Sequence, residues 1–369
     1  MRIKNLNILN FKNYEEESLE FSQGVNIFTG NNGSGKTNLL DAIHFLSMTK
    51  SAFHTTDSQS LKRGENFFSI SGTFSRNDKD YLISTLFQGG KKVFQADKKA
   101  YEKITDHIGR FPIILVTPYD TDLIREGSEE RRKFFDSLFS QIDKHYLIAL
   151  IRYNHVLKQR NSLLKQFAEK RYTDFDLLES YDGPILEEGF KIFRWRKAFI
   201  QEFLPLFNQS YDLLTHKNEV VSFNYQSDVS DPDFELLFKN SVQKDLVLER
   251  TTKGIHKDDY QFLIEGQSVK TSGSQGQQKS YVLALKLASY QLLANYSHTR
   301  PILLLDDIFD KLDEERITSL LKIIDQDNFG QIMITEAKLE RSWEYFKNIR
   351  KEIRIFNISK GKILSVKNA

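Results

Sequence analysis

The chain has 369 residues, of which 40% are hydrophobic and 28% charged, so we expect a globular protein with two lobes rather than a disordered chain. The absence of cysteine excludes a disulfide framework and any thiolate metal site, and it suits a reducing, cytoplasmic location. A formal net charge of +2 excludes a globally basic nucleic-acid binder and leaves only local basic patches for such contacts.

The first third of the chain is predicted to be rich in β-strands. Alternating apolar and polar residues predict strands at residues 2–9, 24–29, 66–75, 81–87 and 92–95. Gly89-Gly90 marks a hairpin between the last two of these. Residues 111–117 form an apolar run that predicts a buried strand, which Pro118 ends.

One segment in this region is typical of nucleotide binding. Residues 30–37 match the pattern G-x-x-x-x-G-K-[ST], with a predicted strand before them and a predicted helix, residues 38–46, after them. Glycines let backbone N–H groups close around phosphates, Lys36 would reach the β and γ phosphates, and the Thr37 hydroxyl would bind Mg²⁺. A plain glycine-rich turn is the alternative, which the correct flanks disfavour. The predicted binding residues here are Gly30, Asn31, Asn32, Gly33, Ser34, Gly35, Lys36, Thr37 and Asn38.

From about residue 120 the pattern becomes helical. Apolar residues at three-and-four spacing predict a long helical region from Ser128, and a turn at Asp182-Gly183-Pro184 precedes a second helical stretch, residues 185–214. Two long antiparallel helices would explain this spacing. We therefore expect a helical lobe, residues 119–245, inserted into a lobe formed by residues 1–118 and 246–369. The aromatic residues between 190 and 203 are interpreted as its core rather than as a base-stacking surface.

Two adjacent carboxylates end the next buried strand. Residues 301–305 are apolar and are followed by Asp306 and Asp307. Charge at the tip of an apolar strand is costly unless it faces a metal ion or water, so we interpret the segment as a Walker B strand rather than an acidic turn. Asp306 would then hold Mg²⁺, while Asp307 and Lys36 would be the catalytic residues, Asp307 polarising the attacking water. A helix at residues 314–324 follows, with Asp313 as its predicted N-cap, and then a strand at residues 331–335.

The order of these motifs is similar to that of known ATPases. Ser274-Gln275-Gly276-Gln277, before a helix predicted at residues 281–296, resembles the ABC-type signature and precedes the Walker B strand. From end to end the chain resembles the RecF family of bacterial recombination proteins. The segments that carry this resemblance are residues 9–14 (Leu-Asn-Phe-Lys-Asn-Tyr), 30–38, 127–136, 254–259 (Gly-Ile-His-Lys-Asp-Asp) and 274–279.

The resemblance implies an α/β fold, namely an ABC-ATPase head related to SMC proteins, with a compact helical lobe in place of a long coiled coil. It implies ATP and Mg²⁺ as cofactors, and Lys12 as a further nucleotide-binding residue. It also implies an ATP-driven head-to-head homodimer in which Ser274, Gly276 and Gln277 act on the γ-phosphate held by the partner subunit. By this resemblance, such a dimer would clamp double-stranded DNA or a double-strand to single-strand junction and would help load RecA with RecO and RecR during gap repair, recombination and the SOS response. The resemblance also implies that slow, DNA-stimulated ATP hydrolysis releases the dimer.

Four positions depart from the ATPase patterns. Ile255 and Lys257 stand where the family usually has proline and arginine. Tyr119 stands where an acidic residue is usual, which leaves a Gln-loop-like contact to Mg²⁺ unassigned, and Thr335 stands where transporter ATPases have a switch histidine.

Local basic residues are the predicted DNA contacts, with a solvated helix face as the alternative for each. They are Lys62, Arg63, Lys91, Lys92, Lys98, Lys99, Arg152, Lys158, Arg160 and Lys165. No base-reading motif is present, so we expect recognition of the DNA backbone or of a junction shape. The eight histidines show no metal-ligand spacing, and His256 is interpreted as a structural residue.

Two other functions remain open at this point. One is an ATP-gated DNA-binding scaffold with negligible turnover. The other is an ABC ATPase of another system, such as a transporter or a nuclease. Against this second alternative stand the absence of an apolar run of roughly 20 residues, of a switch histidine and of an acidic nuclease domain. We expect no membrane partner.

Overall fold

The structure is a computed structural model that describes residues 1–216, 219–309, 313–326, 328–337, 339–347 and 349–369. The chain forms two compact units, defined by contacts between residues. Unit 1 comprises Met1–Thr121, Gln209–Asn218 and Lys279–Ala369, and unit 2 comprises Asp122–Asn208 and Glu219–Gln278.

The first sheet of unit 1 has six strands in the order β15-β14-β3-β13-β12-β8. All neighbours are parallel except β15, which is antiparallel to β14. Strands β3, β8, β12 and β13 are largely buried, as their apolar runs predict for a parallel sheet covered on both faces. The strand bounds are β3 (Val25–Thr29), β8 (Ile113–Val116), β12 (Ile302–Leu305), β13 (Ile332–Glu336), β14 (Ile353–Ser359) and β15 (Lys362–Asn368).

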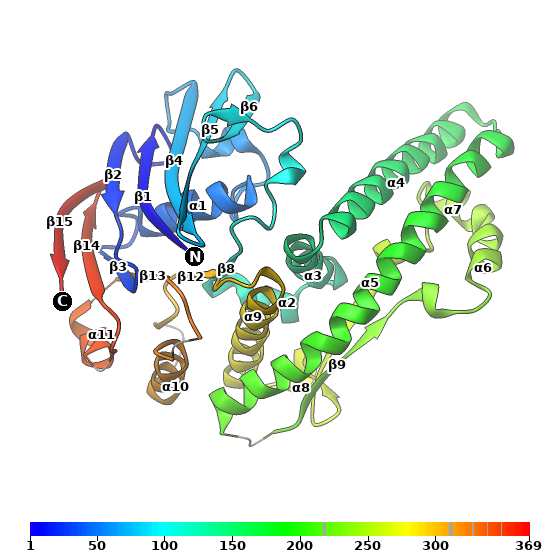
Figure 1. Cartoon of the computed structure of the whole chain (residues 1–369). Coiled ribbons are helices and arrows are strands. Elements are labelled where there is room, and N and C mark those ends of the chain that lie inside the picture. The colour runs from blue at the N-terminus through cyan, green and yellow to red at the C-terminus, as the bar shows by residue number, and fades with distance from the viewer. Residues whose placement is uncertain (217–218, 310–312, 327, 338, 348) are drawn as a thin grey trace. The chain divides into compact units, whose positions relative to one another are not determined.

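The second sheet of unit 1 is antiparallel, in the order β2-β1-β4-β5-β6-β7 (Figure 1). The predicted hairpin is confirmed, because Gln88 pairs with Lys91 across Gly89 and Gly90, both of which have positive φ. The strand bounds are β1 (Arg2–Leu9), β2 (Glu16–Glu20), β4 (Phe67–Arg76), β5 (Lys79–Gln88), β6 (Lys91–Ala96) and β7 (Lys99–Ala100).

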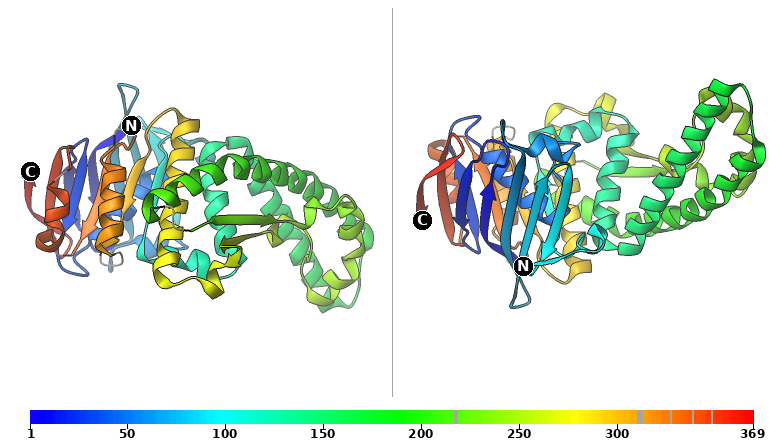
Figure 2. Two further views of the ribbon diagram at one scale, coloured as in Figure 1. Left: turned by 90° about the horizontal axis from the view of Figure 1, so that it is seen from below. Right: turned by 90° about the horizontal axis from the view of Figure 1, so that it is seen from above.

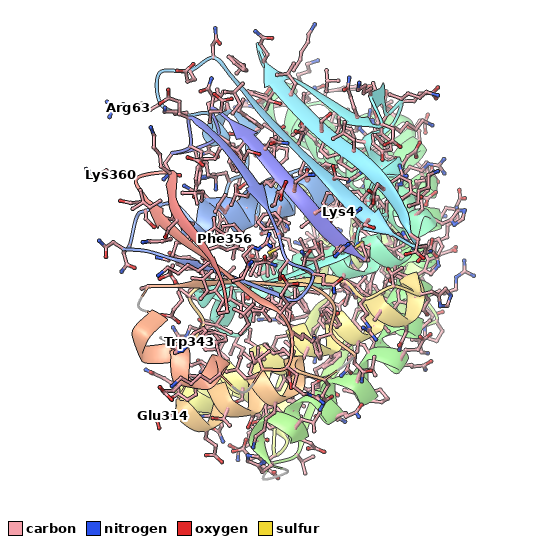
Figure 3. The ribbon with its side chains drawn as sticks, turned by 60° about the vertical axis from the view of Figure 1, so that its left-hand side comes forward. Lys4, Arg63, Glu314, Trp343, Phe356 and Lys360 are labelled. Carbon is pink, nitrogen blue, oxygen red and sulfur yellow. The ribbon has the colours of Figure 1, made fainter. Side chains whose placement is uncertain are left out.

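Helix α1 (Lys36–Met48) contacts strands of both sheets and lies between them (Figures 1 and 2). Its buried Phe45 packs edge-to-face against Phe11 and Phe68 of the antiparallel layer. On the parallel sheet, the labelled Phe356 of β14 packs against Phe28 in the same core (Figure 3). This core fixes the amino end of α1 against the carboxyl end of β3. The other long helices that contribute to unit 1 are α9 (Gln275–Ser297), α10 (Glu314–Ile324) and α11 (Leu339–Phe346).

Unit 2 consists of helices and a small three-stranded sheet, β11-β10-β9, which lies beside the helices of the same unit (Figure 2). Its two longest helices, α4 and α5, run antiparallel, because Arg160 of α4 pairs with Asp182 of α5 and Arg152 with Glu188. The bounds are α2 (Asp122–Arg125), α3 (Ser128–Ile142), α4 (Lys144–Lys170), α5 (Phe175–Thr215), α6 (Phe234–Asn240), α7 (Val242–Leu248), α8 (Val269–Ser272), β9 (Val221–Gln226), β10 (Asp259–Ile264) and β11 (Gln267–Ser268).

The predicted turn at residues 182–184 is wrong, because α5 continues through it with Pro184 and Pro205 inside the helix. The same face is buried before and after the proline, since Leu178, Asp182 and Ile185 are all inside. This continuous packing outweighs the local turn signal of Asp-Gly-Pro. The aromatic residues of this helix do form the core of unit 2, where Phe199 stacks on Phe139.

The division into units differs from the predicted lobe boundaries in two respects. Residues 119–121 and 209–216, expected in the helical lobe, belong by their contacts to unit 1. Residues 246–278 were expected to return to the lobe that holds the phosphate loop, whereas by their contacts they belong to unit 2. The physical reason is strand pairing, because β10 pairs along its length with β9, from Asp259 opposite Gln226 to Ile264 opposite Val221. Among the described residues, no helix is long and apolar enough to cross a bilayer.

Candidate active site

The glycine-rich loop connects β3 to α1 and is bent as its sequence predicts. Gly30 and Gly35 have φ of +150° and +117°, a conformation that side chains disfavour. A Cβ atom at Gly30 would lie 2.1 Å from the Ile358 carbonyl oxygen, and one at Gly35 would lie 2.7 Å from Asn13 Nδ2. Gly30 therefore needs glycine on steric as well as conformational grounds, whereas at Gly35 the positive φ is the main reason, because the atoms in the way belong to side chains.

Lys36 is folded back into this loop. Its side-chain nitrogen donates to the carbonyl oxygens of Gly30 at 2.8 Å and Asn31 at 3.3 Å, and the residue is only 4% exposed. The loop thus keeps a positive charge beside the amino end of α1, where the helix dipole also favours an anion.

A turn that follows strand β1 of the antiparallel sheet forms hydrogen bonds with the glycine-rich loop. Asn13 Nδ2 donates to the Ser34 carbonyl oxygen at 3.1 Å, and the Tyr14 hydroxyl donates to that of Gly35 at 3.0 Å. Asn38 Nδ2 donates in turn to Asn13 Oδ1 at 2.7 Å. The sequence pattern did not assign Asn13 and Tyr14 a part in the site, although they lie in a segment that carries the family resemblance.

Lys12, in the same turn, lies elsewhere in this structure. Its ammonium forms a 2.6 Å ion pair with Asp41 of α1, and both side chains are almost completely buried. Lys12 therefore does not line the pocket described below. Its assignment as a nucleotide-binding residue stays a prediction that requires this ion pair to open.

The two carboxylates at the end of β12 meet the phosphate loop. The Thr37 hydroxyl lies 2.9 and 3.1 Å from the two carboxylate oxygens of Asp306, so the two predicted Mg²⁺ ligands are brought together. Burial raises the pKa of Asp306 above its ordinary value, which the hydroxyl donors of Thr335 and Thr37 oppose and the charge of Asp307 reinforces. A cation at this point would relieve that cost.

The donor set fits Mg²⁺. Hydroxyl and carboxylate oxygens are the ligands that this ion prefers, and it commonly takes only one or two carboxylates from the protein. Across the described residues, no cluster of three or more His, Cys, Asp or Glu side chains could hold a metal ion alone. A phosphate-bearing ligand and water would therefore have to complete the coordination.

Thr37 and the glycine-rich loop line one pocket of about 490 Å³. Its wall includes Asp307, which adopts a left-handed φ of +42°, and Tyr119, which is 68% exposed. Asp120 anchors the turn that carries Tyr119, because its carboxylate accepts from the Thr117 amide at 2.7 Å and pairs with Lys286 at 2.9 Å. The remaining lining residues are Asn32, Gly33, Gly35, Lys36, Thr37, Asn38 and Pro118. The turn keeps a polar anchor at Asp120 although Tyr119 is not acidic.

A larger pocket of about 650 Å³ lies at the opposite, amino ends of the parallel strands. Ligands of open α/β sheets bind at the carboxyl ends, where the glycine loop and the Walker B carboxylates are found. We therefore take the smaller pocket as the site.

The signature segment forms a reciprocal cap at the start of α9. The Ser274 amide donates to Gln277 Oε1 at 2.7 Å, and the Gln277 amide donates to Ser274 Oγ at 3.2 Å. Gln277 Nε2 also donates to Glu219. Ser274 is exposed while Gly276 and Gln277 are partly buried, so the helix start presents its hydroxyl to solvent.

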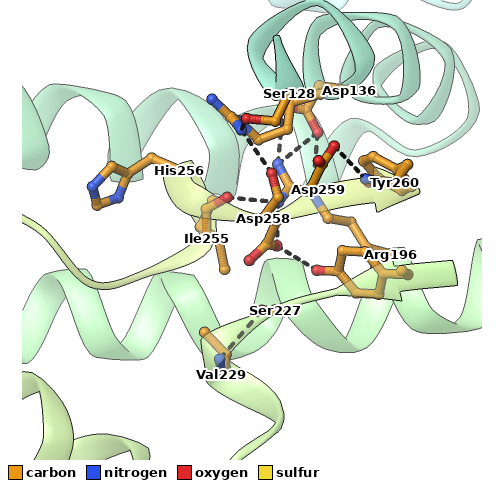
Figure 4. A network of polar contacts seen from close by, with 12 residues as sticks. Ser128, Asp136, Arg196, Ser227, Val229, Ile255, His256, Asp258, Asp259 and Tyr260 are labelled. Carbon is orange, nitrogen blue, oxygen red and sulfur yellow. Dashed lines mark hydrogen bonds and ion pairs between the residues drawn. The ribbon is translucent and has the colours of Figure 1, made fainter. Parts of the chain in front are cut away.

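Two other segments that carry the family resemblance meet inside unit 2. Arg131 of α3 forms a two-pronged ion pair with Asp259, at 2.7 and 3.0 Å. The buried Arg196 of α5 pairs with Asp258 and Asp136 at 2.6 and 2.8 Å (Figure 4). Arg132 donates to the Asp258 carbonyl oxygen. These contacts join α3, α5 and the start of β10, so the segments have a structural role.

His256 belongs to the same region and fits its structural interpretation. Its Nε2 faces the Thr251 carbonyl oxygen at 3.0 Å and so carries the proton, which leaves Nδ1 to accept from the Tyr153 hydroxyl at 2.7 Å. Burial lowers the pKa of His256 to about 4, so the ring is neutral near pH 7.

One of the predicted DNA contacts is wrong. Arg160 is completely buried and pairs with Asp182 at 3.0 Å and Asp245 at 2.7 Å, so it cannot reach a phosphate. Lys62, Lys92 and Arg152 form ion pairs nearer the surface. The exposed members of the set include Arg63, which points outward in unit 1 (Figure 3). The others are Lys91, Lys98, Lys99, Arg152, Lys158 and Lys165.

Comparisons with known proteins agree with this architecture. Residues 2–362 match the family described as the RecF/RecN/SMC N-terminal domain. The chain is similar to a DNA replication and repair protein RecF of Cytophaga hutchinsonii, with 50% identity over 98% of this chain and 96% of the relative.

Two solved structures of the recombination mediator protein RecF in the RecFOR pathway are also similar. One, described as RecF-ATPrS, has a TM-score of 0.88 and 30% identity over 99% of this chain and 98% of its own. The other, described as RecF-ATP, has a TM-score of 0.86 and 29% identity over 100% and 99%. The predicted fold class, an α/β ABC-ATPase head with an added helical lobe, is confirmed by this likeness. With the family match across residues 2–362 and half of the positions identical to a RecF relative, the chain belongs to the RecF family.

Proposed function

We propose that this chain is an ATP-dependent DNA-binding protein of recombinational gap repair, acting in the cytoplasm. The observation that carries the proposal is the meeting of Lys36, Thr37 and Asp307 at one pocket of about 490 Å³, with Asp306 in contact with the Thr37 hydroxyl. A basic loop, two oxygen ligands and a further carboxylate are the groups that ATP hydrolysis requires.

In the binding step, the backbone amides of the glycine loop and the Lys36 ammonium take the β and γ phosphates. Lys36 exchanges its two backbone carbonyl partners, Gly30 and Asn31, for phosphate oxygens. Thr37 and Asp306 are the residues that would hold Mg²⁺, which when bound neutralises charge on the phosphates. Support from a relative comes from the RecF structure that is described with ATP.

In the hydrolysis step, Asp307 orients and polarises the attacking water. The position of Asp307 on the pocket wall supports this role. Asp306 instead accepts a hydrogen bond from the Thr37 hydroxyl, so the two carboxylates would have different roles. We propose a slow, DNA-stimulated ATPase, whose turnover releases the bound state.

The signature segment completes the site in a second copy of the chain. The exposed Ser274 hydroxyl, with the helix-start amides near Gly276 and Gln277, would contact the γ-phosphate held by the partner subunit. ATP would thereby join two heads, and the nucleotide-free chain would be a monomer. The dimer presents two sets of basic residues to double-stranded DNA or to a junction, and phosphate contacts of this kind make binding dependent on salt.

The further steps rest on family membership. RecR, RecO and RecA are the proposed partners, since the solved relatives are described as recombination mediators of the RecFOR pathway.

The test measures fluorescence anisotropy of labelled duplex DNA with and without ATP and Mg²⁺, together with phosphate release. We expect tighter DNA binding with ATP, weakening with salt, and an ATPase rate that rises with DNA. Lys36→Ala is the matched control and should show neither effect. DNA affinity that is equal with and without ATP would overturn the proposal, whereas ATP-dependent binding without phosphate release would favour the scaffold alternative.

A further inference from the structure

Thr335 lies in unit 1 at the position where transporter ATPases have a switch histidine, and that motif gives a threonine no role. It lies on β13, which pairs with β12 in register from Leu303 opposite Ile332 to Leu305 opposite Ile334. The next residues along the two strands, Asp306 and Thr335, therefore come level with each other. Thr335 is completely buried, and a buried hydroxyl requires hydrogen-bond partners.

Both partners of this hydroxyl belong to the pair of carboxylate residues. The Asp307 amide donates to Thr335 Oγ1 at 2.8 Å. The single hydroxyl proton is then left for a carboxylate, and Asp306 Oδ1 lies at 2.8 Å while Asp307 Oδ1 lies at 3.4 Å. The shorter contact identifies Asp306 as the acceptor.

The amide contact bears on an unusual backbone conformation. Asp307 has φ of +42°, in the left-handed region that residues other than glycine rarely adopt unless their surroundings hold them there. The hydrogen bond to Thr335 ties its amide to the neighbouring strand, while its side chain lines the nucleotide pocket. One hydroxyl therefore contacts both the strained backbone of Asp307 and the carboxylate that faces Thr37.

We propose that Thr335 is a positioning residue that sets the directions of both carboxylates. By donating to Asp306 it keeps that carboxylate turned toward Thr37, and by accepting from the Asp307 amide it holds the Asp307 side chain at the pocket. This inference rests on the proposed ATPase function and names a residue that would not touch the nucleotide itself.

The experiment compares Thr335→Val, which keeps the shape and removes the hydroxyl, with Thr335→Ser, which keeps the hydroxyl and removes the methyl group. Thr335→Ala is measured beside them, because it also lacks the hydroxyl but places no methyl group at the position that the hydroxyl occupied. Two readouts are taken, the affinity for ATP with and without Mg²⁺ and the rate of a single round of hydrolysis at saturating ATP.

We expect the valine and alanine variants to lose roughly tenfold or more of the Mg²⁺-dependent gain in ATP affinity and of the hydrolysis rate, the usual range for residues that orient metal ligands. Their ATP affinity without Mg²⁺ should stay within about twofold of the wild type, since the glycine loop and Lys36 are intact, and the serine variant should resemble the wild type.

Two results would overturn the inference alone. One is a wild-type response to Mg²⁺ and wild-type hydrolysis in either variant that lacks the hydroxyl. The other is a serine variant as impaired as the valine variant, which would make the methyl packing responsible. A wild-type protein that shows neither Mg²⁺-dependent ATP binding nor hydrolysis would instead refute the proposed function, and the inference with it.

Discussion

Replacing Arg160 with methionine should destabilise unit 2 by about 3–5 kcal/mol at pH 7, the usual range when one partner of a buried ion pair is removed. The guanidinium is completely buried and contacts Asp182 at 3.0 Å, Asp245 at 2.7 Å and Thr251 at 2.9 Å. Methionine keeps much of the apolar stem but leaves two buried carboxylates without their cation.

The size of this destabilisation depends on protonation of the buried carboxyl groups, which removes the uncompensated charge. A buried carboxyl group can take up a proton, and protonating a group of pKa about 3.9 at pH 7 costs about 4 kcal/mol. Burial already raises the pKa of Asp182, which Arg160 opposes, so removal of the arginine shifts that pKa further upward. The variant's native state then binds more protons than its unfolded state. Its deficit relative to the wild type should shrink by about 1.4 kcal/mol for each pH unit below 7.

Urea unfolding followed by tryptophan fluorescence measures this deficit. The chain has two tryptophans, and in a Trp343→Phe background the signal comes from Trp195 of α5, which contacts Tyr146 inside unit 2. Lys158→Met on α4 is the matched control, because Lys158 is exposed, and it should change the free energy of unfolding by less than about 0.5 kcal/mol.

Two outcomes would contradict a stabilising role of this buried ion-pair cluster. Equal stability of the Arg160 and Lys158 variants would show that the buried cluster contributes little. A deficit that is the same at pH 7 and pH 5.5 would show that lost packing, rather than uncompensated charge, explains the effect.

Three further predictions concern other parts of the chain. Lys36→Ala should lose at least about 100-fold in ATP affinity, because the phosphate charge goes unmatched, and titration with a fluorescent ATP analogue measures this; wild-type affinity would contradict the binding assignment. Ser274→Arg should bind ATP as a monomer and fail to dimerise in sedimentation, and wild-type dimerisation would exclude a signature acting across two copies. Burial lowers the pKa of His107 to about 4. Between about pH 6.5 and 4 the unfolded state therefore binds a proton at His107 that the native state does not bind. As the pH is lowered through this range, the free energy of unfolding decreases by about 1.4 kcal/mol per pH unit. His107→Gln should reduce that slope in acid unfolding curves, and an unchanged slope would contradict the assignment.

Short-range patterns predicted the centre of the site because its chemistry requires a fixed spacing. A phosphate loop needs glycines that can adopt positive φ, then a lysine and a hydroxyl residue, all within one strand-loop-helix unit. Two carboxylates must also end a buried strand. The cap at Asp313 was equally local, and the structure confirms it, since the Asp313 carboxylate accepts from the Arg316 amide at 2.9 Å.

Features that depend on distant partners could not be read in the same way. Arg160 has the pattern of a surface basic residue, but its partners Asp182 and Asp245 are 22 and 85 residues away. Lys12 is held by Asp41 of α1, and α5 continues past Pro184 because its buried face continues. Thr335 becomes informative only when β13 pairs with β12 and places its hydroxyl beside Asp306.

The most direct test of an ATP-joined dimer is the molar mass of Asp307→Asn by light scattering, with and without ATP and Mg²⁺, and then with duplex DNA. The variant should bind ATP without hydrolysing it, because the water-polarising carboxylate is gone while Lys36, Thr37 and Asp306 remain. We predict a monomer without nucleotide, a stable dimer with ATP, and tighter duplex binding by the dimer. A monomer under every condition would contradict the composite site and leave the signature segment with a structural role alone.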